Sequence, residues 1–229
     1  MNLIDKLVFL KSCVATVKDP NNTEDILRAL EKALTPEMAA PVIAHLKSDP
    51  QTKQAVESRL FMPYFKMEEL EAYPEGTLAK ELFHYYKKNG FEPAFFPMEE
   101  DNELNYLRSR VRKTHDIWHV VTGFDTSLPG ELGLLGFAYQ QMRSAPSILI
   151  FILGLMHALI YKREILGECL ESFNRGWILG KNTRMIFGVD WLKMMGLPLT
   201  EVRAQMRLLP QKSLVELGAF HRPNEQVAL

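Results

Sequence analysis

Apolar residues recur three or four positions apart along most of the chain, a spacing that predicts amphipathic helices. The repeats, in chain order, are Leu3, Leu7 and Leu10, then Ile26, Ala29, Leu30 and Ala33, then Val42, Leu46, Ala55 and Leu60. No stretch sustains the alternation of apolar and polar residues that a half-buried strand requires. We therefore predict an all-α fold in one domain covering 1–229, with an N-terminal helical part up to about residue 60.

Helix start and stop signals divide the chain further. Helices are expected to begin at Thr23, Thr35, Thr77, and Asp101 or Asn102, then to cover 146–163, run on through 165–179, and begin once more at 197–201. The helix from Thr77 should end before Asn89-Gly90, and the long one that follows should end near Thr122.

A turn-rich loop, Gly123–Gly130, follows that long helix. Ser127 is a suitable N-cap for the next helix, with Pro129 in its first turn. Glu131 then lies near a helix N-terminus, where the helix dipole favours a carboxylate. Two antiparallel helices joined by this loop can bring Glu131 back to the end of the long helix.

The most apolar segment has eighteen residues without a formal charge, from Ser144 to Tyr161. A membrane-spanning helix needs about 20 predominantly apolar residues, and this segment also contains Pro146, Gly154 and His157. We interpret it as a buried helix of a globular protein, and insertion into a membrane is the alternative.

Composition narrows the function classes. The 229 residues are 47% hydrophobic and 24% charged, with a formal net charge of −1. Since nucleic-acid-binding proteins usually carry a basic excess, we expect no nucleic-acid partner. The two cysteines, Cys13 and Cys169, argue against a disulfide framework and a thiolate zinc site and fit a reducing compartment. The first residues do not resemble a signal peptide.

Candidate chemistry is concentrated in His115-Asp116-Ile117-Trp118-His119, followed after eleven intervening residues by Glu131. Residues four apart share a face of a helix, so His115 and His119 can point the same way, with Asp116 at the edge of that face. The spacing is similar to H-E-x-x-H, in which two histidines hold zinc. We predict a metal site of His115, Asp116, His119 and Glu131, with Asp116 and Glu131 as the candidate catalytic residues.

Two imidazoles and two carboxylates suit several divalent ions. Tetrahedral zinc accepts this set, and Fe²⁺, manganese or Mg²⁺ are the alternatives. If all four residues bind at once the site is closed, whereas release of Asp116 or Glu131 opens a position for water or substrate. The interpretation without a metal is that His115 and Asp116 pair within a polar helix face.

Two arginines, Arg108 and Arg112, share the helical stripe of the histidines. Arg112 can hold Asp116 four residues on, as an outer partner of a metal ligand. Arg108, or Arg110 on the flank, can meet a phosphate or carboxylate headgroup. The alternative for all three is a solvated basic face.

Together these residues resemble the coenzyme Q biosynthesis protein 4 family, which is marked by His-Asp-x-x-His, eleven residues, then Glu. Tyr73–Leu78 is similar to the family's proline-acidic-glycine-(Ser/Thr)-leucine stretch. Further residues stand in the family's order before the motif: Glu103, Tyr106, Arg110 and Arg112. The similarity covers about 65–205. The chain departs from the family pattern at Ala79, where glycine is usual, and at 188–191, which puts a partner contact there in doubt.

The resemblance implies that the motif residues bind a divalent metal, usually zinc. It also implies that the protein organises coenzyme Q biosynthetic enzymes, holds polyprenylated intermediates and takes part in oxidative decarboxylation of the prenylated ring, as a lyase-like activity. Eukaryotic members carry a mitochondrial presequence that this N-terminus does not resemble. We therefore expect a cytoplasmic protein, peripheral to the inner membrane.

The apolar segments Leu132–Ala138 and Ile148–Ile160 exceed what one helix face needs. With Met142 and Met156 as adaptable linings, they predict an interhelical hydrophobic groove for a polyprenyl tail. The alternatives are a thick core or the interface of a homodimer.

Three other functions stay open. An HD-type metal-dependent phosphohydrolase would need His84 and Asp190 beside His115-Asp116, and would leave His119 and Glu131 unexplained. A metalloprotease-like hydrolase would need a glutamate base between the two histidines. A structural membrane-associated adaptor would need the metal only to hold its helices together.

Overall fold

Regular structure is helical throughout the part of the chain that the computed structural model describes, residues 3–20, 22, 35–93 and 99–208. The elements, in chain order, are α1 (Leu3–Lys18), α3 (Pro36–Leu46), α4 (Pro50–Glu57), α5 (Met67–Glu71), α6 (Leu78–Asn89), α7 (Glu103–Thr122), α8 (Leu128–Met142), α9 (Ala145–Tyr161), the 3-10 turn η1 (Arg163–Ile165), α10 (Leu166–Asn182), η2 (Trp191–Met194) and α11 (Leu199–Gln205). The all-α prediction is confirmed. The helix expected from Thr23 lies outside the described residues.

Side-chain caps and left-handed glycines set most of the helix ends that the sequence predicts. Four of the predicted N-cap side chains accept a backbone N–H of the first turn, those of Thr35, Thr77, Asn102 and Ser127, and Asp49 does the same at the start of α4. Gly90 and Gly123 end α6 and α7 in the left-handed conformation that glycine adopts readily. One boundary differs from the prediction: Lys162 leaves the helical conformation, so α9 and α10 are separate helices.

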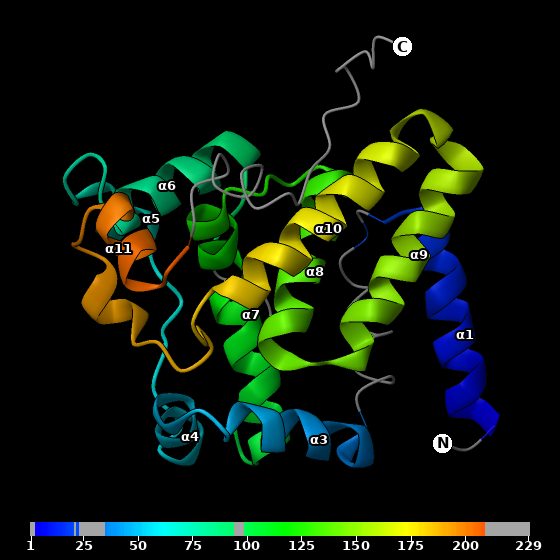
Figure 1. The fold of residues 1–229 in the computed structure, drawn as a ribbon, viewed down its shortest axis with the longest axis horizontal. Coiled ribbons are helices and arrows are strands. Elements are labelled where there is room, and N and C mark those ends of the chain that lie inside the picture. The colour runs from blue at the N-terminus through cyan, green and yellow to red at the C-terminus, as the bar shows by residue number, and fades with distance from the viewer. Residues whose placement is uncertain (1–2, 21, 23–34, 94–98, 209–229) are drawn as a thin grey trace, which may run out of the picture.

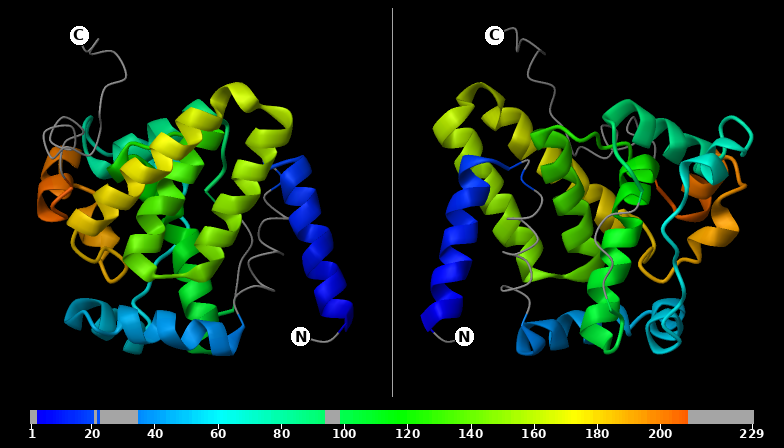
Figure 2. Two further views of the ribbon diagram at one scale, coloured as in Figure 1. Left: turned by 45° about the vertical axis from the view of Figure 1, so that its right-hand side comes forward. Right: turned by 180° about the vertical axis from the view of Figure 1, so that it is seen from behind.

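The helices pack around α8, which contacts α7, α9 and α10 (Figure 1). Its closest neighbour is α10, because a side chain at Gly176 of α10 would meet the Gly133 carbonyl of α8. The view from behind shows α7 beside α8, with α5 and α6 toward one side and α1 on the other, against α9 (Figure 2). The α7–α8 pair therefore lies inside the molecule.

Arg110 joins α7 to two distant segments and is 2% exposed. Its guanidinium donates to the carbonyls of Leu60, Phe187 and Val189 at 3.1, 2.7 and 2.6 Å. Because these bonds occupy the buried group, the headgroup role that the sequence left open for Arg110 is wrong.

The apolar segment from Ser144 to Tyr161 is buried on one side only. α9 packs Ile150 and Leu153 inward, but Leu159 is 54% exposed. The interpretation as a buried helix therefore holds for the inner face only, because α9 lies at the surface beside α1. Among the described residues, no helix combines the length and the apolar character that crossing a bilayer requires.

Candidate metal centre

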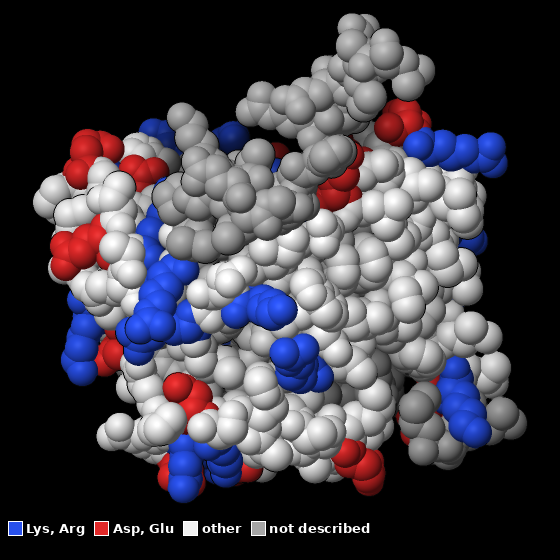
Figure 3. All heavy atoms as spheres, in the orientation of Figure 1, with Lys and Arg blue, Asp and Glu red and all other residues white. Residues whose placement is uncertain are grey.

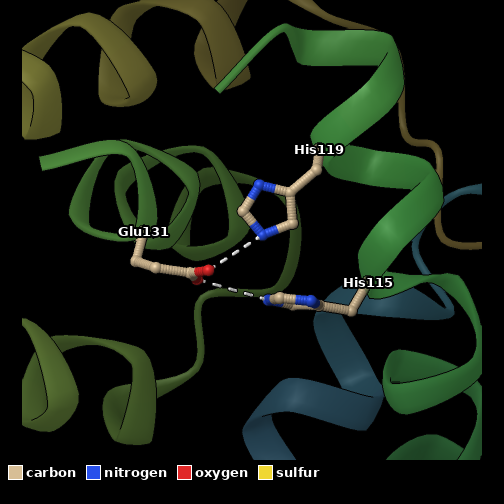
Figure 4. Close-up of side chains that lie close together, drawn as sticks. All are labelled: His115, His119 and Glu131. Atoms are coloured by element: carbon tan, nitrogen blue, oxygen red, sulfur yellow. Dashed lines mark ion pairs between the residues drawn. The ribbon is translucent and has the colours of Figure 1, made fainter. Parts of the chain in front are cut away.

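His115 and His119 project from α7 toward Glu131 in the first turn of α8 (Figure 4). Nε2 of His119 lies 3.2 Å from Oε1 of Glu131, and Nε2 of His115 lies 3.7 Å from Oε2. One ligand atom from each residue lies within 4.8 Å of the others. Two ligands held about 2.1 Å from a tetrahedral zinc ion are roughly 3.4 Å apart, so these separations suit such an ion.

The His119 ring carries the clearest evidence that a cation fits here. Its Nδ1–H donates to the carbonyl of Phe124 at 2.9 Å, which leaves Nε2 as an acceptor in the neutral ring. Nε2 is buried, has no hydrogen-bond partner among the described residues, and faces the Glu131 carboxylate. The buried Nε2 and the partly exposed carboxylate are both acceptors, and they repel unless a cation, a proton or a metal ion, lies between them. The donor set therefore fits a divalent metal ion.

The His115 ring is held in the same way as the His119 ring, except that the partner of Nδ1 is the Asp116 carboxylate and not a backbone carbonyl. Its Nδ1 lies 3.3 Å from Oδ1 of Asp116, and its Nε2 is left to face Glu131. Metal-binding histidines usually donate their second ring N–H to a carbonyl or carboxylate, which fixes the ring and its tautomer. Both histidines show this pattern.

Asp116 is not part of the three-residue cluster. Its carboxylate takes hydrogen bonds from His115 and from the Tyr86 hydroxyl. The expectation that Asp116 is a fourth ligand stays a prediction: Asp116 contacts Nδ1 of His115 but is not among the three residues whose ligand atoms converge.

Charges within the centre keep the carboxylates ionised. Burial opposes the charge on Glu131, but the His119 ring, 3.2 Å away, and the His115 ring hold its pKa below its usual value. Burial is likewise outweighed at Asp116, whose pKa is lowered by His115 and Tyr86. At His115 burial opposes protonation, yet Asp116 and Glu131 raise the pKa. The site is thus a locally negative environment for a cation.

Two aromatic residues of α6 complete the surroundings, and sequence reasoning missed both. The Tyr85 ring stacks on His119 with centroids 5.5 Å apart, and Tyr86 is 5% exposed with its hydroxyl at Asp116. The Phe124 carbonyl was missed as well. No spacing signal marks these groups, because Tyr85 and Tyr86 reach the site only through the packing of α6 on α7.

The two arginines predicted to flank the motif lie on the same helix but do not join the cluster. Arg108 donates to Asn105 at 3.4 Å. The charge of Arg112 acts on the Tyr64 phenol. Their roles toward a headgroup and toward Asp116 stay predictions.

The additional ligands that a phosphohydrolase would need lie elsewhere. His84 pairs with Glu75 at 3.0 Å, and Asp190 pairs with Lys193 at 2.9 Å. Neither belongs to the three-residue cluster.

A cavity of about 470 Å³ opens near the start of α8 and is lined in part by the loop between α7 and α8. Ser127, His157 and Lys162 are among its polar lining residues, beside apolar Leu128 and Ile165. Leu132 to Ala138, by contrast, are largely part of the packed core. The hydrophobic groove for a prenyl tail stays a prediction.

Known proteins are similar to this chain over the region that carries the centre. The model of one protein family, "Coenzyme Q (ubiquinone) biosynthesis protein Coq4", matches residues 2–212 of the chain. The mitochondrial ubiquinone biosynthesis protein COQ4 of Komagataella phaffii is 25% identical over 218 residues, which cover 92% of this chain and 71% of the relative. The homologue of Danio rerio is 23% identical over 204 residues, covering 86% and 73%.

A solved structure has the same fold. The crystal structure of a "Putative ubiquinone biosynthesis protein" from Nostoc punctiforme superposes with a TM-score of 0.81, at 23% identity, over 90% of this chain and 97% of that one. At this identity the likeness establishes the helical fold and nothing about a ligand.

Proposed function

Because the chain belongs to the Coq4 family of coenzyme Q (ubiquinone) biosynthesis proteins, we propose that it binds a divalent metal and a polyprenylated quinone precursor in that pathway. The buried Nε2 of His119, which faces Glu131 with no hydrogen-bond partner among the described residues, carries the metal part of the proposal. Zinc suits the two imidazoles and the carboxylate best, and iron is the alternative.

The ion would be held by His115, His119 and Glu131, with Asp116 or a water molecule available as a fourth ligand. When bound, it would supply Lewis-acid chemistry to a carboxyl or hydroxyl oxygen of the ring. Asp116 and Glu131 are ionised at neutral pH because their pKa values are lowered, so either can accept a proton from a ring hydroxyl.

The reaction we propose is oxidative decarboxylation of the prenylated ring. The bond from the ring to the carboxyl carbon breaks, CO₂ leaves and a hydroxyl takes its place. Dioxygen is the two-electron oxidant, and with one water molecule consumed it leaves as hydrogen peroxide (ArCO₂H + O₂ + H₂O → ArOH + CO₂ + H₂O₂). Zinc has no redox chemistry of its own. The activity therefore needs iron at the site, or a ring that reacts with dioxygen directly. Without such turnover, the same centre serves a scaffold that presents the prenylated intermediate to other enzymes of the pathway.

The surface of α9 supports a location at a membrane. Half of the face shown in Figure 3, over α9 and its neighbours, carries few charged side chains. α9 exposes five large hydrophobic side chains: Ile152, Met156, Leu159, Ile160 and Tyr161. Contiguous apolar surface marks contacts with lipid or protein. We propose that this side of the protein lies against the cytoplasmic face of the inner membrane and contacts the prenyl tail of the ligand. We also propose that the protein is a homodimer.

Metal analysis of the purified protein tests the centre. We expect about one zinc or iron per chain by inductively coupled plasma mass spectrometry, and its loss in His119→Ala. His157→Ala is the matched control, because His157 is also buried and bonds a carbonyl through Nδ1, at 2.9 Å from Val17. Equal metal content in the His119 variant and the wild type would reject the site.

Turnover separates enzyme from scaffold. Incubation with a prenylated hydroxybenzoate labelled with ¹³C at the carboxyl should release labelled CO₂ only from metal-loaded protein. Native mass spectrometry of gently purified protein should show a bound prenyl lipid, and its absence together with no binding of prenyl phosphates would reject the lipid role.

A further inference from the structure

A continuous polar chain leads from α6 into the metal centre. The Tyr86 hydroxyl hydrogen-bonds to the Asp116 carboxylate, and Asp116 in turn lies 3.3 Å from Nδ1 of His115. Tyr86 is 5% exposed, so its ring is held by the core rather than by solvent. The side chain that sets the position of Asp116 therefore comes from a helix that contributes no metal ligand.

We propose that Tyr86 is a positioning residue of the metal centre, which acts through Asp116 to keep Nε2 of His115 turned toward Glu131. His115 needs such support more than His119 does. The His115 side chain is 41% exposed, whereas the His119 side chain is 0% exposed and its Nδ1 bonds a backbone carbonyl. A half-exposed imidazole can rotate about its side-chain bonds unless a fixed acceptor holds Nδ1.

One helix, α6, supports the imidazole rings of both His115 and His119. Tyr85 stacks on His119, and the neighbouring Tyr86 holds the Asp116–His115 pair; the two tyrosine rings contact each other edge to face, 5.9 Å apart. Sites that bind metals tightly depend on such outer groups to keep the ligand geometry. The two tyrosines thus make α6 the support of a centre built on α7 and α8.

The inference rests on the proposed metal centre, and Tyr86→Phe tests it because the change removes only the hydroxyl. Zinc affinity of the full chain is measured by competition with a chromogenic chelator, and the absorption bands of the Co²⁺-loaded protein report the ligand geometry. We expect a 10- to 100-fold weaker affinity, roughly the loss seen when outer partners of metal ligands are removed, and altered Co²⁺ bands.

Tyr106→Phe is the matched control. Tyr106 is also a buried tyrosine, and its hydroxyl donates to the carbonyls of Ala55 and Leu60 at 3.1 and 3.3 Å, away from the centre. This variant should lose stability but keep the wild-type affinity and Co²⁺ spectrum. A comparable loss of affinity in Tyr106→Phe would show that general loosening, and not positioning, explains the result.

A double-mutant cycle tests the route through Asp116. In an Asp116→Ala background, which leaves the Tyr86 hydroxyl no acceptor at that position, adding Tyr86→Phe should change the affinity no further, because the two residues act as one unit. Independent, additive losses would overturn the proposed route, and wild-type affinity in Tyr86→Phe would overturn the positioning role. Wild-type protein that binds no zinc or Co²⁺ would overturn the proposed function itself, and the positioning role with it.

Discussion

Gly176→Ala should destabilise this protein even though alanine is the better helix former. Gly176 lies in α10 against α8, and a Cβ built on it would lie 1.8 Å from the carbonyl oxygen of Gly133. The next nearest atoms are also backbone of α8, the Gly133 carbonyl carbon and the Phe137 nitrogen at 2.8 and 3.0 Å. A side chain could rotate away from the new methyl group, but a helix backbone cannot.

The size of the effect follows from that distance. Real Cβ atoms essentially never approach other atoms within 3.0 Å, so the two helices must part locally by about 1.2 Å (3.0 − 1.8). Forcing extra volume into a packed interior costs about 1–3 kcal/mol, and the upper figure is favoured because all three nearest atoms are helix backbone. The higher helix propensity of alanine returns about 1 kcal/mol. We expect a net loss near 2 kcal/mol, or a melting temperature lower by roughly 4–8 °C for a domain of this size.

Urea and thermal unfolding followed by circular dichroism at 222 nm measure this loss. Gly167→Ala is the control in the same helix, since no atom lies within 4 Å of a Cβ at that position. It should match or exceed the wild-type stability through propensity alone. A Gly176→Ala protein that melts at or above the wild-type temperature would refute the close-contact argument.

Other expectations follow from single groups. Arg110→Met should lower the free energy of unfolding by about 3 kcal/mol in urea titrations, because three backbone carbonyls lose their buried donor; unchanged stability would contradict the role of Arg110 in joining segments. Although burial opposes its charge, Glu100 has a pKa below its usual value because Lys113 and Ser109 bond it. It therefore stabilises the fold above its ordinary pKa, and this contribution is lost as the pH falls through the lower one. Glu100→Gln should cost about 1 kcal/mol at pH 7, with the gap to wild type closing in acid melts; a gap that persists in acid would refute this. Zinc at about 100 times its Kd should add roughly 2.7 kcal/mol to stability, reversed by EDTA and absent in His119→Ala; an equal gain in that variant would place the binding elsewhere.

Local rules account for what the sequence alone established. Ser127 caps α8 because a hydroxyl at that position accepts the Gly130 N–H, and Gly123 ends α7 because glycine adopts a positive φ without strain. The four-residue spacing of His115 and His119 puts both rings on one face of α7, because the face that a residue occupies depends only on the helical period. These features involve neighbours along the chain, and the residue types specify them directly.

Tertiary packing decided the rest. Glu131 meets both histidines, and Tyr86 reaches Asp116, because α6, α7 and α8 cross at one place. The sequence also left open whether Arg110 faces solvent and whether the apolar α9 is covered on all sides; the first is buried and the second is half-exposed. Helical periodicity tells which residues share a face, but not which other helix meets that face. That pairing is set by the fit of whole surfaces, such as the glycine contact of α8 with α10, which no short stretch of sequence contains.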